Sequence, residues 1–223
     1  MRLLLFDIDG TLLTCGPQVR PWFADALVAV YGTAGAIDGY DFAGRTDPEI
    51  VQDLVGDPCP ERLGRMRRRY LDALDRHLDA AAMRLMPGVR PLLDELVTRD
   101  DVVVALLTGN WERGARIKLA RLGLEPYFRL GAFAEDGPAR RDLPPVALSR
   151  ACQHTGREFG AADALVIGDS VHDVACARAH RVPVLAVATS HTPAARLAAA
   201  GADRVISDLT AISADELVSF GVE

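Results

Sequence analysis

The sequence predicts an α/β fold in which a doubly wound parallel sheet is interrupted by an all-helical insertion. Short apolar runs typical of buried strands alternate along the chain with helical patterns, as parallel βαβ units require. The opening run, Leu3-Leu4-Leu5-Phe6, is apolar at every position and therefore indicates a strand that is covered on both faces. Residues 15–83, in contrast, contain helical patterns and no strand pattern.

The insertion is expected to contain three helices. The first begins near Pro21, because proline is favoured at the first position of a helix, and runs towards Tyr31. A short helix follows, with Asp47 as its N-cap and Pro48 behind it. The third covers residues 61 to about 82, where apolar residues recur at three- and four-residue spacing along one face.

Met86-Pro87-Gly88 marks the return to the sheet domain, where strands and helices alternate to the end of the chain. Helices are expected at residues 89–99, 111–122, 144–154, before His180, and at 193–200. Strands are expected at residues 102–107, within 127–133, and at 164–167, 184–187 and 204–206.

Composition excludes several classes of function. With 223 residues, 49% of them hydrophobic and 25% charged, the chain can form one sizeable globular domain carrying a smaller insertion. A net charge of −6 and a pI near 5.4 argue against general nucleic-acid binding. No apolar run approaches the roughly 20 residues of a membrane span, so we expect no membrane partner. The cysteines are scattered and no signal-peptide pattern is present, which predicts a cytoplasmic protein with reduced thiols.

Polar residues with complementary chemistry follow several of the predicted strands. Asp7 and Asp9 follow the first, Thr108 follows the strand at 102–107, and Asp169 and Asp173 follow the strand at 164–167. An acidic turn would explain a bare Asp-x-Asp-Gly equally well. Strand ends on one edge of a parallel sheet converge, however, and neighbouring acids repel one another unless a cation joins them. We therefore expect a catalytic site built around a divalent metal.

The motifs that carry this chemistry resemble those of one family. Asp-x-Asp-Gly-Thr-Leu, the later Thr-Gly-Asn and the final Gly-Asp-Ser-x-x-Asp resemble the haloacid dehalogenase-like hydrolases, and most closely their phosphoglycolate phosphatase-like branch with a helical cap. The resemblance implies a Rossmann-like core formed by residues 1–14 and 84–223, with a cap domain at 15–83. It also implies Mg²⁺-dependent phosphoryl transfer through an aspartyl-phosphate.

The resemblance assigns roles to individual residues. Asp7 would be the nucleophile, and Asp9 the general acid and then the general base. Mg²⁺ would be held by Asp7, by Asp9 through its backbone carbonyl and by Asp169, with Asp173 beside the metal or assisting it.

Residues after the second motif strand would bind the phosphoryl group. Thr108 and the Gly109 N–H would hydrogen-bond its oxygens at a helix N-terminus, with Asn110 beside them. Arg45 and Thr46, in a cap loop that faces the core in the family, are expected to contact substrate, although an ordinary helix start explains them equally well.

One position departs from the family pattern. The family places a lysine shortly before a proline-containing helix start, and this chain has Arg140-Arg141-Asp142-Leu143-Pro144 there. Arg141 matches the expected spacing best and would supply the catalytic cation, with Arg140 as the alternative. The only lysine, Lys118, lies on the helix after Thr108.

These residues predict a phosphomonoester hydrolase that uses Mg²⁺ and acts on a small phosphorylated metabolite, as a monomer or a homodimer. Two alternatives stay open within the family: a sugar phosphomutase, and a non-catalytic member that binds a ligand or a partner. A response-regulator-like domain also has an acidic strand end, but it would need a lysine at a strand end and no large insertion.

Overall fold

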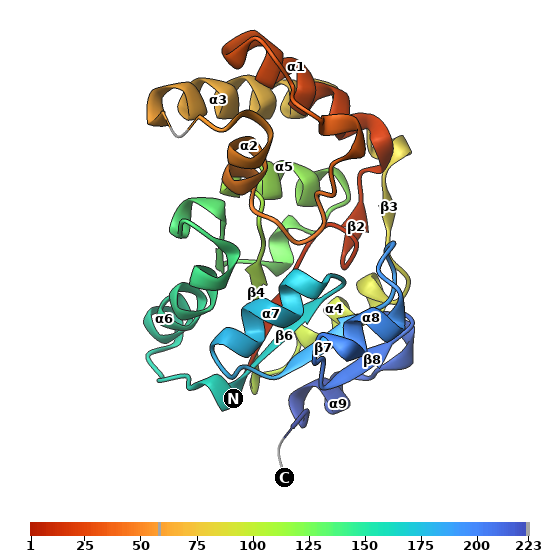
Figure 1. Ribbon diagram of the computed structural model, residues 1–223. Helices are drawn as coiled ribbons and strands as arrows, with labels where there is room; N and C mark the ends of the chain where they lie inside the picture. Colours follow the sequence, from red (N-terminus) through yellow and green to blue (C-terminus); the bar gives the residue numbers. More distant parts are fainter. Residues whose placement is uncertain (58, 222–223) are drawn as a thin grey trace.

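A six-stranded sheet forms the centre of the computed structural model, which describes residues 1–57 and 59–221 (Figure 1). Its strand order is β5-β4-β1-β6-β7-β8, and all of its pairings are parallel. The strands are β1 (Arg2–Phe6), β4 (Val102–Leu107), β5 (Gly131–Ala132), β6 (Ala164–Gly168), β7 (Val184–Val187) and β8 (Arg204–Ile206). The predicted fold class is confirmed, with β1 at the centre between β4 and β6.

Helices cover both faces of this sheet because successive side chains of a strand point to opposite sides. Leu4 and Phe6 of β1 pack in one apolar cluster, and Leu3 and Leu5 pack in the other. The first cluster includes side chains of α4 (Val89–Leu96), α5 (Glu112–Arg121) and α9 (Ala214–Val218), and the second those of α6 (Leu143–Thr155), α7 (Val171–Ala179) and α8 (Ala194–Ala199).

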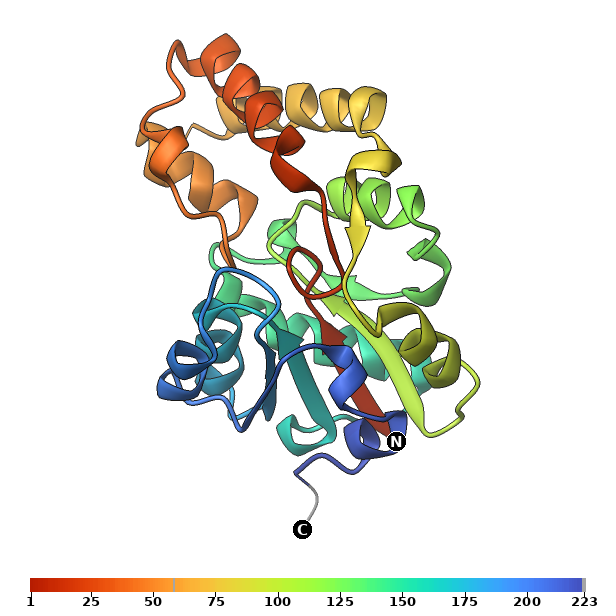
Figure 2. The same ribbon diagram turned by 90° about the vertical axis from the view of Figure 1, so that its right-hand side faces the viewer.

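Three further helices gather beyond the carboxyl ends of the strands: α1 (Val19–Tyr31), α2 (Asp47–Val55) and α3 (Pro60–His77) (Figures 1 and 2). The chain enters this layer after β2 (Leu13–Thr14) and returns through β3 (Arg84–Leu85), and these two segments pair as antiparallel strands. Strands of two residues have no periodicity, so the sequence analysis missed this pair. The buried side chains of α1 and α3 belong to the same apolar cluster as Phe6.

Thr46, and not Asp47 as predicted, is the N-cap of α2. The Thr46 Oγ1 accepts a hydrogen bond of 3.3 Å from the Glu49 N–H, and the Glu49 carboxylate accepts one of 2.9 Å from the Thr46 N–H. This reciprocal pair is a capping box, which a threonine followed by a glutamate three residues later predicts. The N-cap of α2 therefore lies one residue earlier than predicted, and the Asp47 side chain is free to bond a residue outside the helix.

Two helix ends and one helix also differ from expectation. The third insertion helix ends at His77 and not near residue 82, because Asp79 accepts a 2.9 Å hydrogen bond from the Ala81 N–H and begins a separate 3-10 turn. The helix at 89–99 ends at Leu96, and α9 was not predicted. None of the described helices combines the length and apolar character that crossing a membrane demands.

Candidate active site

The pairing of the central strands brings the predicted site residues together. Phe6, the last residue of β1, is in register with residues of both β4 and β6. The residues that follow these strands are Asp7, Thr108 and Asp169, so all three lie at one edge of the sheet. In open parallel sheets this edge is where ligands bind, at the point where the chain changes direction across the sheet.

Asp7, Asp169 and Asp173 form a buried acidic cluster. Each offers a carboxylate oxygen, and these oxygens lie within 4.8 Å of one another. Burial raises the pKa of Asp7 to about 6 and the pKa of Asp169 to about 8, and the neighbouring carboxylates add to both shifts. Buried carboxylates this close repel one another when ionised, so the cluster suits a hard divalent cation with oxygen ligands.

Arg140, and not Arg141, is the cation beside the predicted nucleophile. Its Nη2 lies 2.9 Å from Asp7 Oδ1 and also contacts Asp173 Oδ1. Arg141 is exposed, and its backbone carbonyl lies 2.6 Å from the His180 ring. Adjacent side chains of the 3-10 turn Arg140–Asp142 point in different directions. The predicted spacing was wrong by one residue, and it therefore selected the exposed Arg141 in place of the buried Arg140.

Asp173 serves the local fold as well as the cluster. Its Oδ2 accepts hydrogen bonds of 3.0 Å from the Ser170 N–H and 2.6 Å from the Ser170 hydroxyl, which begins α7 with a capping box. With its other oxygen against Arg140, Asp173 is occupied by protein partners. Asp7 and Asp169 are therefore the side chains of this cluster best placed to hold a cation.

The side chain of Asp9 lies outside the acidic cluster. It is 43% exposed, and its Oδ2 accepts hydrogen bonds of 2.6 Å from Lys118 Nζ and 2.8 Å from Asn110 Nδ2. The expected contact between Asp9 and a metal can therefore involve its backbone carbonyl only. Lys118, which the sequence analysis left on a helix without a role, reaches the site because it lies on the buried face of α5.

Thr108 and Asn110 build the loop that precedes α5. Thr108 is fully buried, and its Oγ1 accepts a 2.9 Å hydrogen bond from the Asn110 amide. The Asn110 side chain is engaged with Thr108, Asp9 and Lys118, so it orders the loop, and the expected contact of this side chain with substrate does not fit. The loop leads directly into the N-terminus of α5, which favours negative charge, and the Trp111 and Glu112 N–H groups there donate hydrogen bonds to the carboxylates of Asp47 and Glu135.

The two cap residues expected to contact substrate have other partners. Thr46 is fully buried, and its hydroxyl donates a 2.8 Å hydrogen bond to Glu49 within the capping box, so its side chain cannot serve a substrate. Arg45 forms a 2.7 Å ion pair with Asp53 and lies over the ring of Tyr40, on the cap itself.

The loop that precedes α2 packs its backbone against the loop that follows β4. The Asp47 N–H donates a 2.7 Å hydrogen bond to the Gly109 carbonyl, and the Asp47 carboxylate accepts one of 2.9 Å from the Trp111 N–H. A Cβ atom at Gly109 would lie 2.0 Å from the Arg45 carbonyl oxygen. Only glycine permits this approach, so the loop before α2 lies in direct contact with the loop that follows β4.

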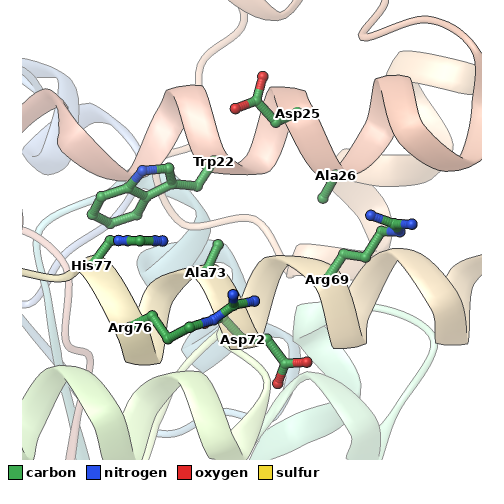
Figure 3. Close-up of a pocket in the computed structure, with 8 residues that line it drawn as sticks. All are labelled: Trp22, Asp25, Ala26, Arg69, Asp72, Ala73, Arg76 and His77. Atoms are coloured by element: carbon green, nitrogen blue, oxygen red, sulfur yellow. The ribbon is translucent and has the colours of Figure 1, made fainter.

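Neither of two hollows on the surface is formed by the predicted site residues. One, of about 790 Å³, lies between α1 and α3 on the cap and is lined by Trp22, Arg69, Arg76 and His77 among others (Figure 3). The second, of about 440 Å³, lies beside α5 and α6. The candidate site is therefore defined by its side chains and not by either of these hollows.

Comparison with known proteins agrees with this geometry. A family model described as haloacid dehalogenase-like hydrolase matches residues 4–178. The chain is 29% identical to a plasmid-encoded phosphoglycolate phosphatase of Cupriavidus necator, over 95% of this chain and 91% of the relative, and 30% identical to a phosphoglycolate phosphatase of Pseudomonas savastanoi, over 93% and 77%. A crystal structure of a hydrolase from Pseudomonas syringae superposes with a TM-score of 0.72 at 22% identity, over 94% of each chain. The resemblance inferred from the motifs is confirmed.

Proposed function

We propose that this chain, which belongs to the haloacid dehalogenase-like hydrolase family and is a phosphatase, hydrolyses a small phosphomonoester through a phosphorylated Asp7. The observation that carries the proposal is the position of Asp7. It is a buried carboxylate at the end of the central strand, and it lies between a guanidinium and a second carboxylate able to hold a metal. This is the arrangement that an anionic nucleophile needs in order to meet an anionic phosphoryl group.

Asp7 is the nucleophile in this proposal. Arg140, 2.9 Å from its Oδ1, opposes the effect of burial on its pKa, so that Asp7 is ionised at and above neutral pH. Its free oxygen attacks phosphorus in line with the leaving alkoxide, and the P–O bond to that alkoxide breaks as an acyl phosphate forms. Water then attacks phosphorus and restores the Asp7 carboxylate.

The acidic cluster fits Mg²⁺, which prefers oxygen ligands. Asp7 and Asp169 would hold the ion with their carboxylates and Asp9 with its backbone carbonyl, and Asp173 would keep Arg140 in place beside them. When bound, the ion supplies positive charge that offsets the repulsion between the carboxylates and a phosphate dianion.

Asp9 transfers the proton, first as general acid towards the leaving alkoxide and then as general base for the attacking water. Its half-exposed carboxylate lies outside the acidic cluster, so it is free of the metal. On the same edge, Thr108 and the Gly109 N–H bind phosphoryl oxygens where the N-terminus of α5 favours negative charge.

The substrate is proposed to be a small phosphorylated acid resembling 2-phosphoglycolate, because the matched relatives carry the name phosphoglycolate phosphatase. We take residues 1–14 and 84–223 as the core and residues 15–83 as the cap. The contact between Asp47 and Gly109 closes the cap tightly over the site, which leaves room for a small metabolite and excludes bulk water during turnover.

The test is phosphate release from a panel of small phosphomonoesters, with and without Mg²⁺, by the wild type and by Asp7→Asn. We expect metal-dependent release that the substitution abolishes. Transfer of the phosphoryl group back to a sugar phosphate without free phosphate would favour the phosphomutase alternative. Binding of phosphomonoesters without turnover would favour the non-catalytic alternative.

A further inference from the structure

Lys118 is a buried cation that the mechanism above does not use. It is the only lysine of the chain, it lies in the second turn of α5, and it is 4% exposed. Lysine is rarely buried to this extent unless its ammonium is paired. Lys118 Nζ lies 2.6 Å from Asp9 Oδ2 and 2.6 Å from Asn110 Oδ1, so both partners belong to the candidate site.

The ammonium determines which way the Asn110 amide faces. An ammonium can only donate hydrogen bonds, so Asn110 must present its carbonyl oxygen to Lys118. The amide nitrogen then faces the other way, 2.8 Å from Asp9 Oδ2 and 2.9 Å from Thr108 Oγ1. Since Thr108 Oγ1 accepts this bond, its own hydroxyl proton is free to be donated to a phosphoryl oxygen.

We propose that Lys118 is a positioning residue of this site, which holds the Asp9 carboxylate directly and the Thr108 hydroxyl through Asn110. The inference rests on the proposed function, because it assigns Asp9 to proton transfer and Thr108 to the phosphoryl group. The site then has two buried cations with separate partners. Arg140 serves the nucleophile from one side, and Lys118 serves the proton-transfer residue from the other.

A spectroscopic test is available because the chain has one lysine. Labelling with [¹⁵N]lysine gives a single side-chain ammonium signal, which exchange with water removes for an exposed lysine near neutral pH. We expect a visible signal in the wild type that shifts or vanishes in Asp9→Asn. A wild-type signal that is absent, or one that Asp9→Asn leaves unchanged, overturns the contact on which the proposal depends.

Kinetics separates positioning from a merely structural role. Lys118→Met retains the length of the side chain and removes its donors. An alkyl ester such as 2-phosphoglycolate needs a proton on its leaving group, whereas p-nitrophenyl phosphate does not. We expect the first-turnover rate to fall about 100-fold for the alkyl ester, within the range of general acid catalysis, and at least tenfold less for the aryl ester.

The matched control is Arg116→Met, which removes a cation from the same helix. Arg116 bonds the Phe128 carbonyl and does not touch the site, so this substitution should leave both rates near those of the wild type. Equal losses on the two esters in Lys118→Met would show that Lys118 does not act through the proton-transfer residue Asp9 and would overturn the proposal. If the wild type hydrolyses neither ester, the proposed function fails, and the ammonium signal still decides whether Lys118 holds Asp9.

Discussion

Replacing Arg140 with methionine should destabilise the protein in a way that depends on pH. Arg140 is 5% exposed and bonds Asp7, Asp173 and the Leu107 carbonyl. Removing one partner of a buried ion pair leaves an uncompensated charge, which typically costs about 3–5 kcal/mol. In Arg140→Met that charge belongs to the carboxylates of the cluster, so the cost should be present only where they are ionised.

The sign follows from the carboxylate pKa values. Burial already raises the pKa of Asp7 to about 6 and that of Asp169 to about 8, above the ordinary value of 3.8, and loss of Arg140 raises the pKa of Asp7 further. A raised folded-state pKa makes stability fall as pH rises through it. We therefore expect Arg140→Met to lose about 3–5 kcal/mol of unfolding free energy at pH 8 and less than half of that at pH 5.

Urea denaturation in EDTA at the two pH values measures this loss, and added Mg²⁺ should recover part of it at pH 8 because the ion replaces the missing positive charge. Arg141→Met is the matched control: the side chain is adjacent and exposed, so its loss should fall within about 0.5 kcal/mol at both pH values. An equal loss for Arg140→Met at pH 5 and pH 8 would refute the electrostatic reasoning and indicate that the guanidinium contributes by packing.

Three further perturbations test the closed cap and the metal site. Gly109→Ala should lower kcat/KM with little change in folding, because its Cβ would lie 2.0 Å from the Arg45 carbonyl and push the cap loop away. Gly39→Ala, where a Cβ meets open space, should leave kcat/KM unchanged, and equal effects of the two would count against the contact. Mg²⁺ binding should release close to one proton at pH 7, because burial raises the pKa of Asp169 to about 8 and the ion binds the deprotonated carboxylate. Calorimetry in buffers of different ionisation enthalpy measures the number of protons released. Identical binding heats in all buffers would contradict the prediction. Burial also raises the pKa of Asp47 to about 7, so the free energy of unfolding of the wild type should fall as pH rises from 4 to 7. The amide in Asp47→Asn stays neutral, so at pH 8 this variant should be more stable than the wild type by up to about 4 kcal/mol. Parallel stability curves for the two proteins in urea would show that this carboxyl is not buried in solution.

The sheet could be predicted closely because its strands carry their own signal. The runs at 102–107, 184–187 and 204–206 coincide with β4, β7 and β8, since an apolar run ended by glycine and polar residues has few other interpretations. The strands also predicted where the acidic residues lie, because residues that follow neighbouring parallel strands must meet at one edge of the sheet. Asp7, Thr108 and Asp169 therefore required no tertiary information beyond the fold class.

The contacts that side chains of helices and turns make could not be predicted from the sequence in the same way. Arg140 and Arg141 are equivalent in the sequence, and only the direction of a 3-10 turn decides which one lies against Asp7. The expected substrate contacts of Thr46 and Asn110 do not fit the structure for a related reason. Each side chain is hydrogen-bonded to a neighbouring residue whose position depends on packing.

By itself, then, the sequence determined the parallel sheet, the helical layer after the first strand and the acids at the strand ends, because local periodicity and strand order specify them. Only the tertiary structure decided which cations serve those acids. Lys118 lies 109 residues from Asp9 in the chain, and the two meet because Lys118 lies on the buried face of α5. A charge pair of this kind is set by how a helix is rotated about its axis, and several rotations fit the sequence pattern of α5, in which five of the ten residues are charged, until its neighbours are in place.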